Sequence, residues 1–257
     1  MWTRTGAVAA SMLIAALAGA SAPARAADGN DAVDVELVLA VDVSLSMDES
    51  SYKMEMQGYA DAFRNPAVQE AIKMGGTGRI AVALMQWSGY GTYKVSLGWT
   101  VVDCDGAADE LAGMIAGIER MPGGSTSISG AIDKGLALFE GNGFDSARRV
   151  IDISGDGRNN NGRDVAAARE EAVAKGVIIN GLPIAGGEPG LEEYYQATVI
   201  GGPGAFMVIA HGYDDFGQAI TKKLIAEIAN VSPDMLPATV QHAEDQGAIG
   251  RSKLALN

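Results

Sequence analysis

Residues 35–46 read Val-Glu-Leu-Val-Leu-Ala-Val-Asp-Val-Ser-Leu-Ser. The first seven are almost continuously apolar, which is typical of a strand buried on both faces of a parallel sheet. Asp42, Ser44 and Ser46 then alternate with apolar residues, so the three polar side chains lie on one side of the extended chain. This segment predicts a buried strand that leads directly into a polar loop at the edge of a sheet.

Strands and helices are expected to alternate along the rest of the chain, because short apolar runs follow segments with apolar residues at helical spacing. This alternation predicts one doubly wound α/β domain, residues 33–230, with a mainly parallel sheet flanked by helices on both faces and a loosely ordered tail, residues 231–257. We expect strands at residues 35–41, 79–87, 92–102 (an antiparallel edge strand), 149–154, 177–184 and 205–209. We expect helices at residues 50–63, 108–118, 128–139, 164–175, 191–196 and 216–228.

The composition indicates an acidic globular protein. The chain has 257 residues, of which 47% are hydrophobic, and a formal net charge of −13. That hydrophobic content is too high for a disordered chain. The negative charge repels other polyanions, so we expect no nucleic-acid partner and no binding to anionic membrane surfaces. Metal ions and cationic groups fit the charge better.

The first 26 residues have the pattern of an export signal. A basic residue, Arg4, precedes an apolar run at residues 6–22, and Ala24-Arg25-Ala26 has the small-residue pattern of a cleavage site. The run is shorter than the roughly 20 residues that a membrane-spanning helix needs. We therefore predict a cleaved signal peptide at residues 1–26 and a mature protein without membrane insertion, in the periplasm or alternatively outside the cell.

Polar loops follow the carboxyl ends of two predicted strands, and a third lies between them in the sequence. The loop after one strand contains Asp42, Ser44 and Ser46, and the loop after the other contains Asp156. The loop between them in the sequence is Gly123-Gly-Ser-Thr126-Ser. Carboxylates and hydroxyls are hard oxygen ligands that suit Mg²⁺, Mn²⁺ or Ca²⁺. Taken alone, the loop with Asp42, Ser44 and Ser46 is better interpreted as a capped helix entry, but a cap does not require the other two loops.

These three motifs resemble the von Willebrand factor A-type domain family, in which they form a metal-ion-dependent adhesion site. The resemblance covers roughly Val33–Ala229 and implies one divalent cation, with Mg²⁺ expected and Mn²⁺ or Ca²⁺ as alternatives. It also implies a protein or peptide partner whose Asp or Glu completes the coordination of the metal. The implied site consists of three hydroxyl ligands and two nearby carboxylates, from Ser44, Ser46, Thr126, Asp42 and Asp156.

Other segments carry further expectations. Residues 194–195, residues 199–206 and the final helix resemble a bacterial exported family of unknown function. The loop Arg158–Arg163 follows Asp156 and contains three consecutive asparagines. It is interpreted as a polar surface turn, with a grip on an anionic partner as the alternative.

Two other functions remain open at this point. In a phosphatase of the haloacid dehalogenase type, Asp42 would be the nucleophile, and Asp156 and Asp164 would hold the metal. That chemistry needs a general acid two residues after the nucleophile, where this chain has Ser44. In the second alternative the metal serves stability alone. The favoured hypothesis is a binding module that is not an enzyme.

Overall fold

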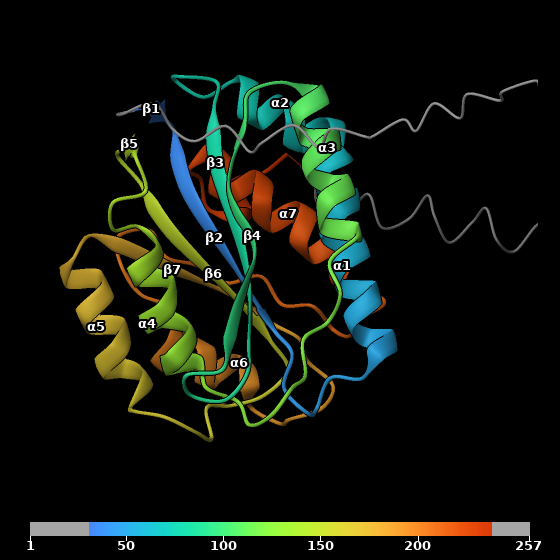
Figure 1. The fold of residues 1–257 in the computed structure, drawn as a ribbon, viewed down its shortest axis with the longest axis vertical. Coiled ribbons are helices and arrows are strands. Elements are labelled where there is room, and N and C mark those ends of the chain that lie inside the picture. The colour runs from blue at the N-terminus through green and yellow to red at the C-terminus, as the bar shows by residue number, and fades with distance from the viewer. Residues whose placement is uncertain (1–30, 238–257) are drawn as a thin grey trace, which may run out of the picture.

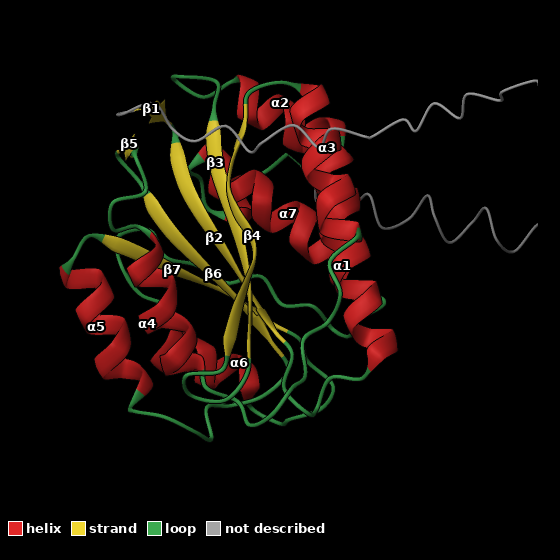
Figure 2. Ribbon diagram, in the orientation of Figure 1, coloured by secondary structure: helices red, strands yellow, loops and turns green. Residues whose placement is uncertain are grey.

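The computed structural model describes residues 31–237. The expected signal peptide at residues 1–26 and the last part of the expected tail, residues 238–257, lie outside the described residues. A five-stranded sheet forms the centre of the domain and has helices on both faces (Figures 1 and 2). Its strands, from edge to edge, are β4 (Tyr93–Val102), β3 (Ile80–Trp87), β2 (Val35–Asp42), β6 (Arg149–Gly155) and β7 (Val177–Pro183).

The expected doubly wound, mainly parallel sheet is confirmed. The central strand β2 pairs in parallel with β3 on one side and β6 on the other, and β6 pairs in parallel with β7. Every residue of β2 and β3 is buried, which explains their nearly continuous apolar sequences. Only β4 runs antiparallel to its neighbour, β3, and it forms one edge of the sheet.

The helices form two layers. Apolar side chains of α1 (Glu49–Arg64), α3 (Asp105–Ala116) and α7 (Phe216–Ala229) belong to one core cluster, to which α2 (Pro66–Lys73) also contributes. On the other face, α4 (Ile128–Leu138), α5 (Val165–Ala174), α6 (Leu191–Tyr194) and the π-helix η1 (Tyr195–Val199) build the second cluster. Among residues 31–237, no helix has the length and apolar character needed to cross a membrane.

The order of the strands brings the predicted polar loops together. The chain proceeds from β2 outward to β3 and β4, and then returns to β6 on the other side of β2. The carboxyl ends of β2 and β6 therefore lie next to each other at the point where the strand order reverses, which is where open α/β sheets bind ligands. In the view of Figure 1, the loops that follow these strands lie at the lower edge of the sheet.

The segment expected as a strand at residues 205–209 is not a regular strand, and that prediction was wrong. Met207 forms an isolated bridge to Gly181 of β7, and Ala210 forms one to Ile184, the residue after β7. The preceding turn explains the irregularity, because Gly202 and Gly204 have φ values of 101° and 74° and enclose Pro203. Such values are left-handed and incompatible with a continuous extended strand.

Four further elements were not predicted. Helix α2 begins at a proline and uses the Asn65 side chain as its cap. The short strands β1 (Asp31–Val33) and β5 (Phe144–Ser146) pair with each other outside the main sheet. The 3-10 helix η2 (Pro233–Met235) follows α7, and the adjacent Leu236 is buried against the first core cluster.

A buried ionic cluster lies between the sheet and α7. The Lys223 ammonium is fully buried and lies 2.7 Å from a carboxylate oxygen of Asp152 on β6. It also contacts Glu227 one helical turn away, and the amide of Asn180 donates to the same Glu227 oxygen. Buried charges of this kind are tolerated because each has an opposite charge or a hydrogen-bond partner.

Candidate metal centre

The loop after β2 holds its polar side chains by local hydrogen bonds. Asp42 is the last residue of β2 and is fully buried. Its Oδ1 accepts the backbone N–H of Ser44 at 2.7 Å, the turn that aspartate favours because its short side chain reaches the backbone two residues on. The hydroxyl oxygens of Ser44 and Ser46 lie 2.9 Å apart. The alternation expected from the sequence therefore places all three side chains around one point.

Asp156 joins this group from the end of β6. The Ser46 hydroxyl donates to Asp156 Oδ1 at 2.5 Å, and the Tyr213 hydroxyl donates to Asp156 Oδ2 at 2.9 Å. Gly155 lets β6 approach closely, because a Cβ there would lie only 3.0 Å from Asp42 Oδ2. The two acidic residues, far apart in sequence, thus approach the same end of the sheet.

Thr126 is held against both loops. A Cβ on Gly123 would lie 1.9 Å from the carbonyl oxygen of Val43, so only glycine allows this close passage of the two loops. The backbone N–H of Thr126 donates to Asn160 Oδ1 at 2.9 Å. A Cβ on Gly157, the residue after Asp156, would lie 3.9 Å from the Thr126 hydroxyl oxygen. The hydroxyl of Thr126 is therefore close to the Asp156 turn.

Arg120, which the sequence analysis did not single out, and Asn160 of the polar turn hold the loops from outside. The Arg120 guanidinium donates to the carbonyl oxygens of Val43, Ser44 and Met47 at 2.7–3.1 Å. Asn160 also donates its backbone N–H to the Thr126 carbonyl at 2.9 Å. These contacts link residues that are distant in sequence, so no local pattern could reveal them.

The asparagine side chains of the loop after Asp156 accept hydrogen bonds from backbone N–H groups of neighbouring segments. Besides Asn160, Asn161 accepts the N–H of Tyr90 at 2.6 Å and Asn159 accepts the N–H of Ser129 at 3.2 Å. The Arg158 guanidinium is engaged within the chain, because it pairs with Glu188 at 3.3 Å and donates to the carbonyls of residues 189 and 190. The simpler interpretation of this loop, a polar turn, accounts for these contacts.

Further acidic and phenolic groups lie beneath the loops. Glu55 of α1 is fully buried and accepts the hydroxyl of Ser154 at 2.6 Å. The Tyr195 hydroxyl, also buried, has no hydrogen-bond partner among residues 31–237, and neither does Asp42 Oδ2. Burial raises the pKa of Asp42 from 3.8 to about 7, and the neighbouring charge of Asp156 adds to this effect. Burial likewise raises the pKa values of Glu55 and Tyr195.

The charges at this site fit a hard cation. Within the described part of the chain, neither Asp42 nor Asp156 forms an ion pair, although both carboxylates lie beside the serine hydroxyls. Residues 31–237 contain no group of three or more His, Cys, Asp or Glu side chains arranged to hold a metal. A cation here would therefore depend on hydroxyl oxygens as well as carboxylates, a donor set that suits hard divalent ions.

Comparison with known protein families assigns this chain to one of them. Residues 32–232 match a family described as "Protein of unknown function (DUF1194)". The chain belongs to the DUF1194 family. None of the curated proteins matches it at a significant level. The resemblance to an exported family of unknown function, noted from residues 194–206, agrees with this membership, and the family description itself assigns no activity.

Solved structures share the fold of this DUF1194 protein. One is proximal thread matrix protein 1 from the mussel byssus, with a TM-score of 0.60, 15% identity, and coverage of 78% of this chain and 48% of that one. A further structure of the same mussel protein is described as having a zinc-occupied MIDAS motif (TM-score 0.56, 14% identity, 77% and 46% coverage). Another is the pilus adhesin SpaC from Lactobacillus rhamnosus GG (TM-score 0.53, 15% identity, 79% and 31% coverage).

These similarities confirm the von Willebrand A-type fold expected from the sequence motifs. Because the identities are low, they establish the fold alone. The DUF1194 chain spans about half the length of the mussel protein and about a third of the pilus adhesin.

Proposed function

We propose that the DUF1194 domain binds one divalent cation and uses it to bind an acidic residue of a protein or peptide partner. The observation that carries the proposal is the meeting of two carboxylates without a cationic partner, within the described residues, beside serine and threonine hydroxyls. The residues that would hold the cation are those expected from the sequence: Asp42, Ser44, Ser46, Thr126 and Asp156.

The chemistry of this donor set explains how such a site would act. Neutral hydroxyls donate little charge, so a dication held by them retains affinity for a further anionic ligand. Ser46 is exposed and Asp156 is partly exposed, so the site is open to a partner on that side. Leu45, between the two serines, is 81% exposed, which provides apolar surface next to the charged group for a partner to cover.

The identity of the ion is proposed from ligand hardness. Oxygen donors favour Mg²⁺, Mn²⁺ or Ca²⁺ over ions that prefer nitrogen and sulfur, and we expect Mg²⁺. The zinc in the MIDAS motif of the mussel protein supports a divalent ion in a related fold. Zn²⁺ therefore belongs in the same titrations.

Calorimetric titration of the full chain with Mg²⁺ and Mn²⁺ tests the metal site. Asp156→Asn is expected to abolish binding, because it removes a carboxylate that accepts the Ser46 hydroxyl. Asp164→Asn is the matched control, since Asp164 caps α5 by accepting the N–H of Ala167 and asparagine caps equally well. Binding by the Asp156 variant with wild-type affinity would remove the proposal.

Partner binding is tested separately. Proteins of the cell envelope are passed over immobilised wild type and Asp156→Asn, with Mg²⁺ and then with a chelator. The proposal requires a protein that is retained by the wild type and released by the chelator. If Mg²⁺ binds but raises only the thermal stability, and no protein is retained, the metal serves stability alone.

The phosphatase alternative has little support in the geometry. Asp42 is fully buried and already accepts the N–H of Ser44, whereas a nucleophile must reach the phosphorus atom. Asp164 caps α5 instead of joining the other acids. We expect no release of phosphate from a generic phosphoester in the presence of Mg²⁺. Export through a signal peptide at residues 1–26, and a periplasmic location, remain part of the proposal, since that segment lies outside the described residues.

A further inference from the structure

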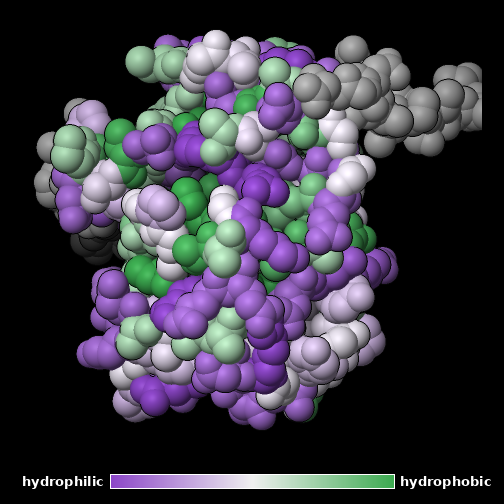
Figure 3. Space-filling model, turned by 90° about the vertical axis from the view of Figure 1, so that its left-hand side faces the viewer, coloured by the Kyte–Doolittle hydropathy of each residue, from purple (hydrophilic) through white to green (hydrophobic). Residues whose placement is uncertain are grey.

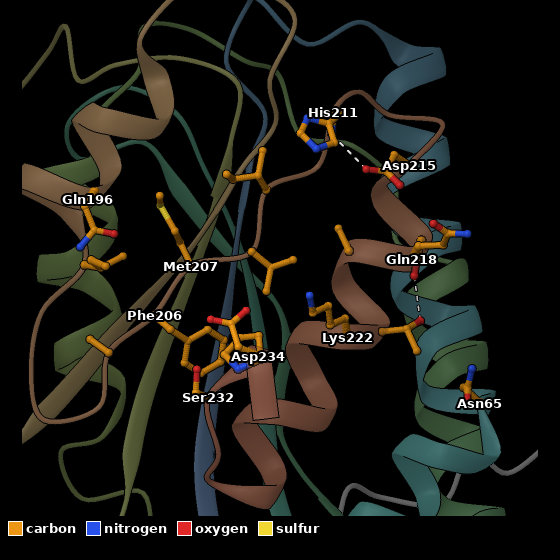
Figure 4. A pocket seen from close by; sticks show the side chains of 18 residues that line it. Asn65, Gln196, Phe206, Met207, His211, Asp215, Gln218, Lys222, Ser232 and Asp234 are labelled. Atoms are coloured by element: carbon orange, nitrogen blue, oxygen red, sulfur yellow. Dashed lines mark hydrogen bonds between the residues drawn. The ribbon is translucent and has the colours of Figure 1, made fainter. Parts of the chain in front are cut away.

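A groove follows the irregular segment Ala205–Ala210 on the β7 side of the sheet. It encloses about 630 Å³. Its apolar surface comes from Ile200, Phe206, Met207 and Ile209, and polar side chains surround it (Figure 4). Figure 3 views the side on which α5 and β7 lie in Figure 1 and shows hydrophobic residues gathered in a hollow between hydrophilic surfaces.

The backbone of this segment is paired on one side only. The N–H groups of Val208 and Ala210 donate to Gly181 and Pro183 of β7, at 3.1 Å in both cases. Among the described residues, no hydrogen bond involves the N–H or C=O of Met207 or Ile209. The segment is therefore the free edge of the sheet, with backbone donors and acceptors of the kind that an added strand pairs with.

The walls of the groove limit what can pair with this edge. Gln196 of η1 lies on one side of the segment, and Gln218 and Lys222 of α7 lie on the other (Figure 4). The helices that cover a second folded sheet would meet these walls, whereas a single extended chain carries no covering layers. The shape therefore favours a peptide segment over a second copy of this domain.

The charge in the groove favours an acidic segment. Lys222 is half-buried, and its side chain points into the groove (Figure 4). It forms no ion pair within residues 31–237. Two carboxylates, Asp215 and Asp234, also line the groove. Asp215 already accepts the backbone N–H of His211 at 3.0 Å, and Asp234 is not without a partner either. An ammonium without a partner, next to apolar surface, attracts a carboxylate.

We propose that the free edge at Ala205–Ala210 binds an extended segment of a partner protein, which adds a strand to the sheet and places an acidic side chain against Lys222. The backbone of Met207 and Ile209 supplies the pairing, and the apolar surface of the groove receives alternate side chains of the added strand. This binding mode does not depend on a metal ion.

The test uses the full chain and a capped seven-residue probe peptide of alternating valine and threonine with glutamate at its centre. Amide exchange measured by NMR is expected to slow at least about tenfold at Met207 and Ile209 when the probe is added, because both N–H groups become paired. The same peptide methylated on alternate backbone nitrogens is the control, since it retains the side chains and loses the donors. Equal protection by both peptides, or no protection by the first, overturns the proposal.

The charge of Lys222 is tested by reversal. K222E is expected to weaken binding of the glutamate probe by about tenfold and to favour a probe with lysine at its centre, which corresponds to one partly buried ion pair. Lys53, an exposed lysine of α1, provides the control variant K53E, which should bind as the wild type does. If K222E does not fold, K222Q takes its place with a smaller loss of affinity. Unchanged affinity in a folded Lys222 variant contradicts the acidic preference.

Other occupants of the groove give distinct results. Slow exchange at Met207 and Ile209 in the full chain without any peptide means that the groove is already filled, and this overturns the proposal. Protection that disappears on dilution identifies a second copy as the occupant. Protection that persists on dilution but disappears when residues 238–257 are removed identifies the chain's own C-terminal residues.

Discussion

The substitution Asp42→Asn is expected to change metal binding and metal-free stability in opposite directions. Asp42 is fully buried, and its Oδ2 accepts no hydrogen bond among the described residues. Burial, with the nearby charge of Asp156, raises its pKa from 3.8 to about 7. At about 1.36 kcal/mol per pKa unit, this corresponds to an upper value of about 4 kcal/mol for ionising the carboxyl in the metal-free protein.

The direction of the pH dependence follows from proton binding. Between 3.8 and about 7 the Asp42 carboxyl is protonated in the folded protein and ionised in the unfolded chain. The folded state then binds more protons, so the free energy of unfolding of the metal-free wild type falls as the pH rises through this range. Asparagine carries no charge, so the free energy of unfolding of D42N does not contain this dependence on pH. Metal-free D42N should therefore match the wild type below the lower pKa and exceed its stability by up to about 4 kcal/mol above the higher one.

Mg²⁺ is expected to offset most of this difference in stability. A cation beside the ionised Asp42 stabilises the wild type by about 2.7 kcal/mol when its concentration is a hundred times the dissociation constant, whereas D42N should gain nothing. The gain should shrink as the pH falls, because protons compete with the metal for the carboxylate.

Urea unfolding measured with Mg²⁺ and with a chelator, on both sides of neutral pH, tests the expected behaviour of D42N. D164N provides the control for removing one negative charge. The reasoning about Asp42 is refuted if metal-free D42N is less stable than the wild type at high pH. It is equally refuted if D42N binds Mg²⁺ as the wild type does.

Three other substitutions test how the loops and the core are held. G123A places a Cβ 1.9 Å from the Val43 carbonyl and should abolish Mg²⁺ binding in calorimetry, whereas G98A, with open space around it, should bind normally. R120A leaves three loop carbonyls without their donor and should lower the free energy of unfolding by about 1–3 kcal/mol and weaken Mg²⁺ binding; equal stability in urea would contradict this role. K223M removes the ammonium that pairs with the buried carboxylates of Asp152 and Glu227. It should lower the free energy of unfolding by about 3–5 kcal/mol in the same urea assay without changing the Mg²⁺ affinity relative to the wild type.

The central part of the fold could be predicted because its physical cause is local. A strand buried on both faces, such as β2, must be almost continuously apolar, and the antiparallel β4 follows a glycine-containing turn. Residues 205–209 show the limit of that reasoning. Their apolar pattern is the same as that of a strand, but the pairing depends on the turn at Gly202 and Gly204 and on what covers the outer edge.

The candidate site likewise has one part that could be predicted from the sequence and another that could not. The polar loops could be recognised because Asp42 and Asp156 follow buried strands whose carboxyl ends meet. The groups that hold these loops could not be recognised, because Arg120, Asn160 and Tyr213 act across long sequence separations.

The most direct test of the proposed metal site is a crystal structure of the full chain grown with Mn²⁺, in which anomalous scattering locates the ion. We predict one Mn²⁺ within coordination distance of hydroxyl oxygens of Ser44, Ser46 or Thr126, with the carboxylates of Asp42 and Asp156 bound directly or through water. A fully ordered loop region without an anomalous peak, or a peak only at other residues, would contradict the account.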